Sequence, residues 1–291
     1  MHLRDTALSL IVVLTLAGCA GDPASPTMAV DGPSLAYTSA TGATIVTENE
    51  IVRQAENTPP TGSWVLYTRN AGAGAFRVGP GTAPEGVGSL ELATPTGADK
   101  LFLFNYGYVG TPLGAIDALG YSTYRTAGSA QQVTALNIEV DHNGADAGGF
   151  TTLVFEPVYN TAQGPVVGDA WQSWDAHVDG SAIWWSSRAI PGVCAFDCFV
   201  TWDAILAANP DAVIVGGIGV NQGSGNDGLT AAVDAFTVGV GGASTTYDFE
   251  PWVAATTRQA CKDDGWQTLK RADGSDFSNQ GACVSYVETG R

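Results

Sequence analysis

Short stretches of alternating apolar and polar residues are the feature that most constrains how this chain can fold. They follow one another from about residue 44 to residue 250 and are separated by Gly, Asn and Asp. Alternation with a period of two puts every second side chain on the same face of a strand. The spacing predicts an all-β fold, an antiparallel β-sandwich or jelly roll, from SWVLYTR (63–69), GSLELAT (88–94), KLFLFNY (100–106), ALNIEVD (135–141), TTLVFEPVY (151–159), AWQSWDAHV (170–178), SAIWWSS (181–187), AVIVGGIGV (212–220) and AVDAFTVGV (232–240).

The segment 135–141 shows how the two faces of such a sheet differ. Leu136, Ile138 and Val140 alternate with polar residues and should face the core. The opposite, outward face should carry a row of amide, hydroxyl and carboxylate side chains from this segment and the next one, namely Asn137, Glu139, Asp141, Thr152 and Glu156. One short helix is expected at 201–209, because Thr201 can cap its start and Pro210 ends it.

Four tryptophans give the sharpest indication of a binding surface. They lie on two segments joined by Asp179-Gly180, a dipeptide typical of hairpin turns, and are Trp171, Trp174, Trp184 and Trp185. Because each segment has one tryptophan of each parity, one indole from each should be buried and one exposed. We expect the exposed pair, with Asp175 beside it, to form a platform for sugar rings. The alternative is that all four are structural.

The charge of the chain excludes one class of partner. With 12 Lys and Arg against 29 Asp and Glu, the net charge is −17. Nothing in the sequence offers the basic patch that phosphate backbones require, so we expect no binding to nucleic acid.

The start of the chain has an apolar run over 7–17, which is too short to span a bilayer but has the length of a signal-peptide core. The tetrad Leu16-Ala17-Gly18-Cys19 that ends it resembles the lipobox of bacterial lipoproteins. The resemblance implies that Cys19 is acylated and becomes the first residue after cleavage, with Ala20 favouring the outer membrane where there is one. A plain secretory signal is the alternative. The resemblance places the protein in the bacterial cell envelope, anchored to a membrane by lipid and exposed outside the cytoplasm.

The four remaining cysteines indicate disulfides, because an even number outside the cytoplasm is typical of them. Sequence proximity favours the pairs Cys194–Cys198 and Cys261–Cys283. A zinc site would need two closely spaced pairs, and the second pair is too wide for that.

The C-terminal residues 261–287 resemble a motif found at the ends of bacterial secreted proteins, Cys-Lys-x-x-Gly-Trp followed by Asn-Gln-Gly-x-Cys-Val-Ser-Tyr-Val. We know of no activity tied to this motif. Similarly, AVDAFTVGV followed by TTYDFE (245–250) resembles the last strand of carbohydrate-binding-module-like jelly rolls. We therefore expect a signal peptide, a lipid anchor with a flexible tether, a β-sandwich and a cysteine-stapled segment at residues 1–18, 19–43, 44–250 and 251–291.

Two further chemistries have partial support. Glu139-Val140-Asp141 resembles half of the E-x-D-x-x-E strand of laminarinase-type endoglucanases, but the second glutamate is missing. No G-x-S-x-G elbow is present for a serine hydrolase. No cofactor is required by any motif, although calcium could bind the loop residues Asp141, Asn143 and Asp146, which a plain hairpin turn explains as well.

The sequence thus favours a non-catalytic envelope lipoprotein that binds a glycan or surface polymer through exposed aromatic residues. A polysaccharide-active hydrolase or lyase on a β-sandwich is the second hypothesis. A structural or interaction module without a small ligand is the third.

Overall fold

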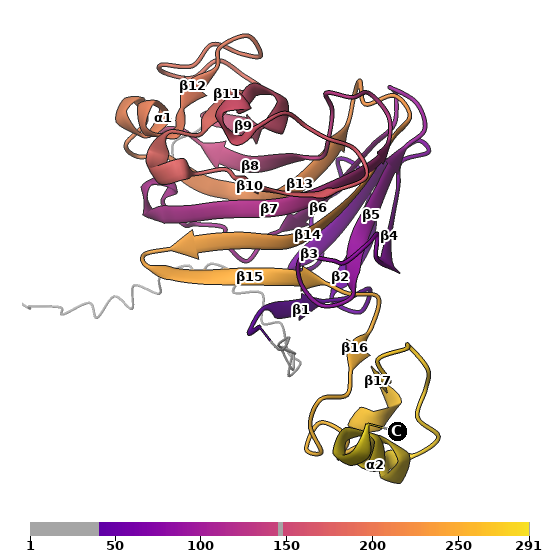
Figure 1. Ribbon diagram of the computed structural model, residues 1–291. Helices are drawn as coiled ribbons and strands as arrows, with labels where there is room; N and C mark the ends of the chain where they lie inside the picture. The colour runs from indigo at the N-terminus through magenta and orange to yellow at the C-terminus, as the bar shows by residue number, and fades with distance from the viewer. Residues whose placement is uncertain (1–40, 145–147, 291) are drawn as a thin grey trace, which may run out of the picture. The chain divides into compact units, whose positions relative to one another are not determined.

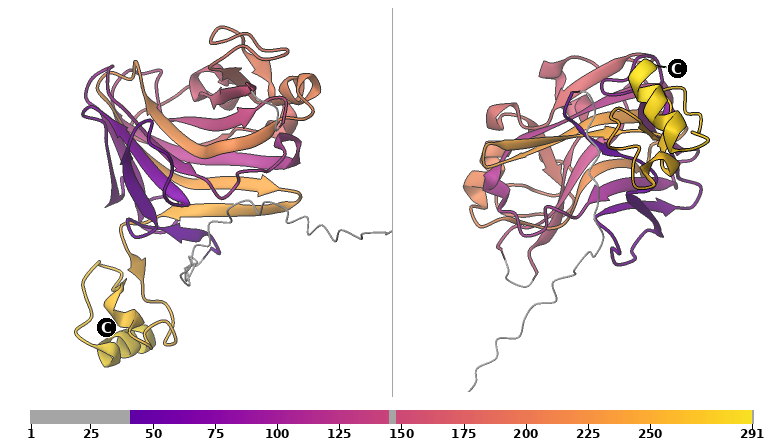
Figure 2. Two further views of the ribbon diagram at one scale, coloured as in Figure 1. Left: turned by 180° about the vertical axis from the view of Figure 1, so that it is seen from behind. Right: turned by 90° about the horizontal axis from the view of Figure 1, so that it is seen from below.

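The computed structural model describes residues 41–144 and 148–290. Two β-sheets pack face to face over one hydrophobic core, as the layers in Figure 1 and the views from behind and below in Figure 2 show. This arrangement is the predicted all-β sandwich of jelly-roll type. Most neighbouring strands are antiparallel, and the exceptions within the two sheets are the parallel pairs β1–β15 and β2–β3.

The first sheet has eight strands. Their order is β12 (Val200–Thr201), β11 (Ile183–Ser186), β9 (Phe150–Phe155), β8 (Ala135–Asp141), β13 (Val213–Gly223), β6 (Lys100–Asn105), β3 (Trp64–Arg69) and β2 (Ile51–Ala55). The register confirms the two predicted faces of β8, because Ile138 pairs with Leu153 in the core while Glu139 pairs with Thr152 on the outward side.

The second sheet has seven strands and a fork. They are β1 (Thr44–Val46), β15 (Ala243–Phe249), β14 (Leu229–Val240), β5 (Gly88–Thr94), β4 (Ala73–Val78), β7 (Ile116–Ala127) and β10 (Trp171–Asp175). One edge of β14 pairs with β5 up to Val233 and with β15 from Phe236 onward. Ala235, at a φ of 52°, lies at the change of partner. The opposite edge pairs with β7 along almost its whole length.

The core between the sheets consists of the apolar side chains that alternation places inward. Leu66, Leu103, Phe155, Trp184 and Phe236 are among its fully buried members. Burying a side chain of this size contributes about 1.5–3 kcal/mol, so the alternating pattern supplies the main driving force for the sandwich.

Helix α1 (Trp202–Ala208) lies where the sequence predicts a helix. The side chain of Thr201 accepts a hydrogen bond from the backbone N–H of Ala204, which satisfies one of the free donors at the helix start. No described helix is long and apolar enough to cross a membrane. The described 3-10 helices are η1 (Leu113–Ala115), η2 (Pro157–Tyr159), η3 (Thr161–Gln163), η4 (Val178–Gly180) and η5 (Gly265–Gln267).

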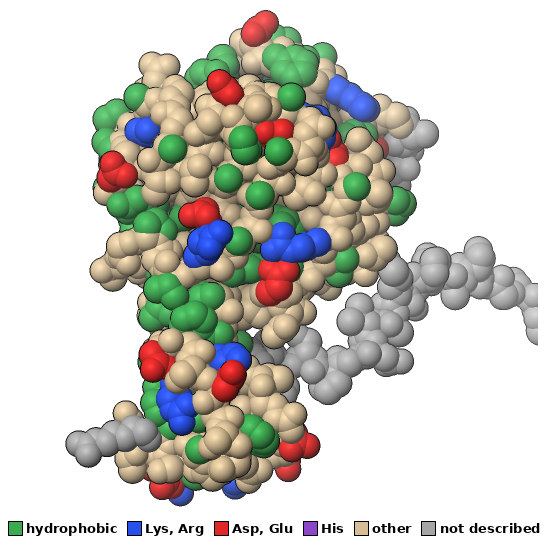
Figure 3. Space-filling model, turned by 90° about the vertical axis from the view of Figure 1, so that its right-hand side faces the viewer, with side chains coloured by type: hydrophobic (Ala, Val, Ile, Leu, Met, Phe, Trp, Pro, Cys, Tyr) green, Lys and Arg blue, Asp and Glu red, His purple; other side chains and the backbone are tan. Residues whose placement is uncertain are grey.

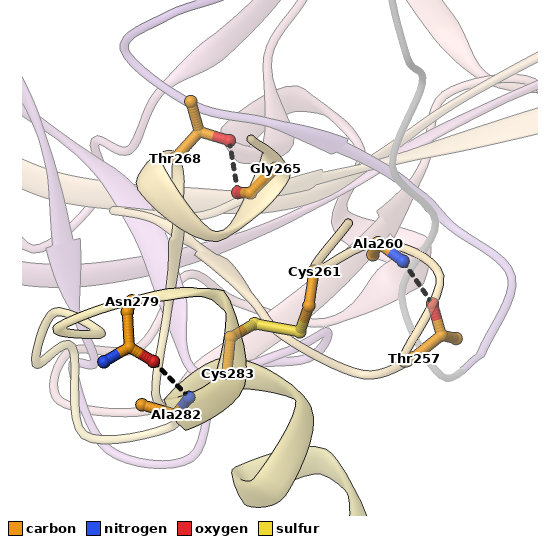
Figure 4. The surroundings of a disulfide bond; sticks show 8 residues. All are labelled: Thr257, Ala260, Cys261, Gly265, Thr268, Asn279, Ala282 and Cys283. Atoms are coloured by element: carbon orange, nitrogen blue, oxygen red, sulfur yellow. Dashed lines mark hydrogen bonds between the residues drawn. A yellow bond between two sulfur atoms is a disulfide. The ribbon is translucent and has the colours of Figure 1, made fainter. Parts of the chain in front are cut away.

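The C-terminal segment has its own small core and a disulfide. It contains the parallel strands β16 (Val253–Ala254) and β17 (Leu269–Lys270) and a second helix, α2 (Gln280–Thr289), which the sequence analysis did not anticipate. Asn279 caps α2 by accepting from the N–H of Ala282 at 2.8 Å (Figure 4). The Cys261–Cys283 disulfide joins α2 to the preceding loop, and Cys194–Cys198 forms the second disulfide, so both expected pairs are present.

Candidate functional site

The outward face of the eight-stranded sheet carries a second group of aromatic rings, separate from the core. Tyr67 of β3 stacks on Phe102 of β6 with ring centroids 4.8 Å apart, and Phe102 contacts Phe104 at 4.7 Å. The hydroxyl of Tyr106 donates to that of Tyr67 at 3.2 Å. Tyr67, Phe102 and Phe104 are buried against one another, whereas Tyr106 is half-buried and reaches the surface. The rings therefore form an apolar floor that is largely covered, and its edge at Tyr106 is polar and reaches the surface.

Amide side chains lie beside this floor. In the register of the sheet, Phe102 pairs with Asn221 of β13, and Phe104 pairs with Gly219, which in turn pairs with Asn137 of β8. All of these residues face outward. We call Tyr67, Phe102, Phe104, Tyr106, Asn137, Glu139 and Asn221 the outer-face site.

Glycines in β13 let the two sides of this site approach each other. A Cβ on Gly217 would lie 2.3 Å from the ring of Phe104, and a Cβ on Gly216 would lie 2.1 Å from a carboxylate oxygen of Glu139. Both separations are well below contact distance. The glycine run in AVIVGGIGV therefore lets the ring of Phe104 and the carboxylate of Glu139 approach the backbone of β13 closely.

Two polar atoms of the site have no hydrogen-bond partner among residues 41–144 and 148–290. They are the side-chain oxygens Oδ1 of Asn137 and Oδ1 of Asn221, and both are buried. Asn137 as a whole is 8% exposed. A buried carbonyl oxygen left without a donor costs about 1–3 kcal/mol. The site thus contains two buried acceptors to which no described residue donates.

Two carboxylates also face outward, Glu139 and Glu156. Burial raises the pKa of both; a hydrogen bond from the N–H of Gly217 partly offsets this at Glu139, and one from the indole of Trp185 does so at Glu156. Glu139 of β8 pairs with Thr152 of β9. Glu156 follows Thr152 by four residues and lies just past the end of β9. The Cα atoms of Glu139 and Glu156 are therefore about 13 Å apart along the strand direction, and their carboxylates accept from different donors.

The tryptophan segments do not form the expected hairpin. Strand β10 pairs with β7 in the seven-stranded sheet, whereas β11 pairs with β9 and β12 in the eight-stranded sheet. Residues Val178 and Asp179 have φ values of 46° and 48°, and η4 carries the chain from one sheet to the other. The prediction of one platform built from both segments is therefore wrong.

The parity argument for the same residues is confirmed. Trp174 and Trp184 are 2% and 0% exposed and belong to the core between the two sheets, away from the outward faces. Trp171 and Trp185 are half-buried. Trp171 lies on the outward face of the seven-stranded sheet, where its indole donates to the backbone oxygen of Pro80 at 2.8 Å and its ring packs on Tyr124. Trp185 is the predicted tryptophan that shares a sheet face with the outer-face site.

Asp175 is exposed and lies in the seven-stranded sheet, away from Trp185. Its Oδ1 accepts from the backbone N–H groups of His177 and Val178, which fixes the turn after β10. It lines a cavity of about 420 Å³ together with Ser173, His177 and Thr237, among others. Its hydrogen bonds account for it as a turn residue.

The loop expected to hold calcium is described in part. Asp141 accepts from the N–H of Asn143 at 3.1 Å, and a Cβ on Gly149 would lie 2.0 Å from an Asp141 oxygen and 1.9 Å from Oδ1 of Asn143. The oxygens of these two residues thus converge over Gly149. Asp146 lies outside the described residues. Within residues 41–144 and 148–290, no three His, Cys, Asp or Glu side chains form a metal-binding group.

A buried carboxylate cluster, not singled out from the sequence, fills the fork of the seven-stranded sheet. Asp234 accepts from the N–H groups of Glu85 and Phe249, and Glu250 accepts from those of Val87 and Gly88. Both oxygens of Asp248 are buried beside Glu250 and accept no hydrogen bond from the described residues. In the sequence these acids stand in AVDAF (232–236) and TYDFE (246–250). The alternation of apolar and polar residues does not show that the two segments bring their carboxylates together.

The charged side chains elsewhere are dispersed. Figure 3 shows acidic and basic side chains scattered over the face it presents, and described ion pairs such as Arg77–Glu91 are largely exposed. Exposed pairs of this kind contribute little to stability.

No protein-family model and no curated protein matches the chain. Among solved structures, it is similar to a family 11 carbohydrate-binding module from Clostridium thermocellum in complex with a β-1,3-1,4-mixed-linked tetrasaccharide. The TM-score is 0.35 and the sequence identity is 10%, over 65% of this chain and 91% of that chain.

Proposed function

We propose that the protein is a lipid-anchored protein of the bacterial cell envelope that binds a glycan at the outer-face site. The observation that carries the proposal is a pair of buried amide oxygens, on Asn137 and Asn221, that lie beside a floor of aromatic rings. No donor for either oxygen lies in the part of the chain that the structure describes. Sugars combine hydroxyl donors with apolar C–H faces. A site with a few directed acceptors on an apolar floor suits that chemistry.

The identity of the polar groups narrows the class of glycan. The acceptors of the site are two amide oxygens, to which no described residue donates, and the carboxylate of Glu139, which accepts one hydrogen bond from the N–H of Gly217. Lys100 is held by Glu56 at 3.0 Å, so this nearby cation is already paired. Acceptors bind hydroxyl or ammonium groups and repel carboxylates. A neutral or amino glycan is therefore favoured over a uronate polymer.

Binding is favoured over hydrolysis because both outward carboxylates are already engaged. Glu139 accepts from the N–H of Gly217, and Glu156 accepts from the indole of Trp185.

The anchor is proposed from the sequence. Cys19 lies outside the described residues, and its place at the end of a lipobox-like tetrad supports acylation. Two acyl chains give stable attachment where a single one gives marginal binding. Two disulfides agree with an oxidising compartment outside the cytoplasm.

Calorimetric titration of the Cys19→Ser protein tests the binding proposal. The probes are oligosaccharides of β-1,3-glucan, β-1,4-glucan, chitosan and polygalacturonate. We expect binding to at least one neutral or amino probe and a loss of about tenfold or more in affinity in Asn137→Ala and Tyr106→Ala. Tyr124→Ala is the matched control, because Tyr124 is half-buried on the opposite sheet. Absence of binding to every probe, or equal losses in Tyr124→Ala, would refute the proposal.

A further inference from the structure

A small disulfide loop holds a phenylalanine out in solvent. Cys194 and Cys198 are bonded, and Phe196 between them is 60% exposed. Its φ of 59° lies in the left-handed region, which residues with a large side chain rarely adopt. The N–H of Phe196 donates to the backbone oxygen of Ser186 at 3.0 Å, which ties the loop to β11. Backbone strain that the surroundings maintain is found most often at functional sites.

Three more aromatic rings lie at or next to this loop, in two contacting pairs. The ring of Phe196 lies 5.6 Å from that of Trp185 and is tilted by 38° to it. Nearby in sequence, Phe199 lies 4.2 Å from Tyr159, and these side chains belong to residues that are 42% and 45% exposed. We call Tyr159, Trp185, Phe196 and Phe199 the aromatic rim. Exposed aromatic residues gathered in this way mark interaction sites far more often than scattered ones do.

Polar groups of the rim are carboxylates. The indole N–H of Trp185 donates to Glu156 at 2.9 Å, which fixes the plane of the ring. Asp197 is exposed in the disulfide loop, close enough to Tyr159 to act on its hydroxyl electrostatically. No Lys or Arg forms a described ion pair with either acid. The rim therefore combines apolar ring faces with hydrogen-bond acceptors.

The rim is continuous with the outer-face site. Trp185 pairs with Val154 of β9, and Val154 pairs with Asn137 of β8, all on the outward side of one sheet. Adjacent strands are about 4.8 Å apart, so Trp185 lies about 10 Å from Asn137 across the sheet. This separation is about that of two residues in a glycan chain, so one bound chain can reach both.

We infer that the aromatic rim is an additional sugar-binding subsite, which takes a pyranose ring of a neutral or amino glycan extending from the outer-face site, and that the Cys194–Cys198 disulfide holds Phe196 ready for it. This inference rests on the proposed function. Stacking of a sugar on Phe196 or Phe199 exploits rings that are already exposed and ordered, so little conformational freedom is lost on binding. The rim then determines which chain lengths bind tightly.

A chain-length comparison tests the inference. Trisaccharides and heptasaccharides of β-1,3-glucan, β-1,4-glucan and chitosan are titrated into the Cys19→Ser protein and into variants made in it. We expect Phe196→Ala to weaken heptasaccharide binding about tenfold, by analogy with aromatic stacking in single-strand recognition, and to leave trisaccharide binding unchanged. Cys194→Ser with Cys198→Ser should weaken heptasaccharide binding in the same direction. Because Phe196 is exposed, the thermal midpoint of Phe196→Ala should stay that of the parent.

Phe150→Ala is the control, since Phe150 is an exposed phenylalanine at the other end of β9. Its heptasaccharide affinity should be unchanged. Equal heptasaccharide affinity in the parent, Phe196→Ala and Phe199→Ala would overturn the inference while leaving the proposed function in place. A parent protein that binds none of the probes would overturn both.

Discussion

The carboxylate of Asp234 accepts a hydrogen bond from the N–H of Phe249 at 3.0 Å, at the point where β14 changes its partner from β5 to β15. The fork leaves backbone N–H groups that no strand can pair. Asp234 and Glu250 satisfy four of them with their side chains. The cost is a cluster of three acids with little exposure to water, because Asp248 lies beside them.

Stability should therefore fall as the pH rises. Burial and the charge of Glu250 raise the pKa of Asp234 to about 7 despite its hydrogen bonds, and burial with repulsion from Glu250 and Asp234 raises that of Asp248. Unfolded carboxylates titrate near about pH 4. The folded chain thus holds more protons than the unfolded one above about pH 4, and the stabilising contribution of these protons is lost as the pH rises through about 7.

Urea unfolding at pH 5 and pH 8 measures this effect. We expect Asp248→Asn to raise the free energy of unfolding at pH 8 by about 1–3 kcal/mol, with a smaller gain at pH 5. Asp211→Asn, at an exposed acid, is the control and should change neither value. A loss of stability in Asp248→Asn at pH 8 would contradict the prediction and would mean that the charged cluster is compensated by a cation.

Neighbouring tryptophans should differ sharply in their effect on folding. Trp184 is fully buried in the core, whereas Trp185 is half-buried on the outward face. We expect Trp184→Ala to lower the free energy of unfolding by about 3–5 kcal/mol. Trp185→Ala should lower it by about 1 kcal/mol, through the hydrogen bond to Glu156. Similar losses in the two variants, measured by urea unfolding, would show that the assignment of faces in β11 is wrong.

The alternation of the sequence predicts the strands well but does not decide which apolar face is the core. KLFLFNY places Leu101 and Leu103 on one side and Phe102 and Phe104 on the other, and both sets are apolar. The structure puts the leucines in the core and the phenylalanines outside. For β8 the outward face carries Asn137 and Glu139, so there the prediction of both faces was possible and was confirmed.

Strand pairing between residues distant in sequence explains why the tryptophan segments do not form the predicted hairpin. Asp179-Gly180 is a local turn signal, but whether the strands it joins lie in one sheet depends on their partners β7 and β9, which are distant in sequence. The aromatic rim has no periodic signature, since Phe196 is presented by a five-residue disulfide loop with strained backbone. The second helix is preceded by Asn279, a residue type typical of helix N-caps. This indication of a helix start was present in the sequence.

The proposed membrane anchor would depend on a single atom, the thiol sulfur of Cys19. We expect Cys19→Ser to move the protein from the membrane fraction to the soluble fraction and to abolish labelling by an acyl-chain probe. Ser25→Ala, in the segment predicted to be a tether, is the control and should leave both unchanged. Membrane association of Cys19→Ser equal to that of the parent would refute acylation at this position.

Calcium should stabilise the loop after β8. The oxygens of Asp141 and Asn143 converge over Gly149 and would supply two of the about 6–8 oxygen ligands that calcium takes. We expect the thermal midpoint to rise with calcium over about 10⁻⁴–10⁻³ M, the range of extracellular modules, and Asp141→Asn to abolish the rise. An unchanged calcium response in Asp141→Asn would place the ion elsewhere, and no response in the parent would remove calcium from this protein.

The C-terminal segment should depend on its disulfide for folding. Its core has six buried residues, which are Val253, Ala255, Cys261, Leu269, Phe277 and Cys283. A core of this size rarely holds a fold without a cross-link. The Cys261–Cys283 bond joins residues 22 positions apart, which should contribute about 3 kcal/mol by restricting the unfolded chain.

We therefore expect Cys261→Ser with Cys283→Ser to make residues 255–290 sensitive to limited proteolysis while the sandwich stays resistant, as mass spectrometry of the fragments would show. Cys194→Ser with Cys198→Ser provides the control, since it removes a disulfide but leaves the C-terminal core unchanged, and its C-terminal segment should resist cleavage like that of the parent. Equal resistance of the C-terminal segment in both double variants would mean that packing around Phe277 and α2 suffices without the cross-link.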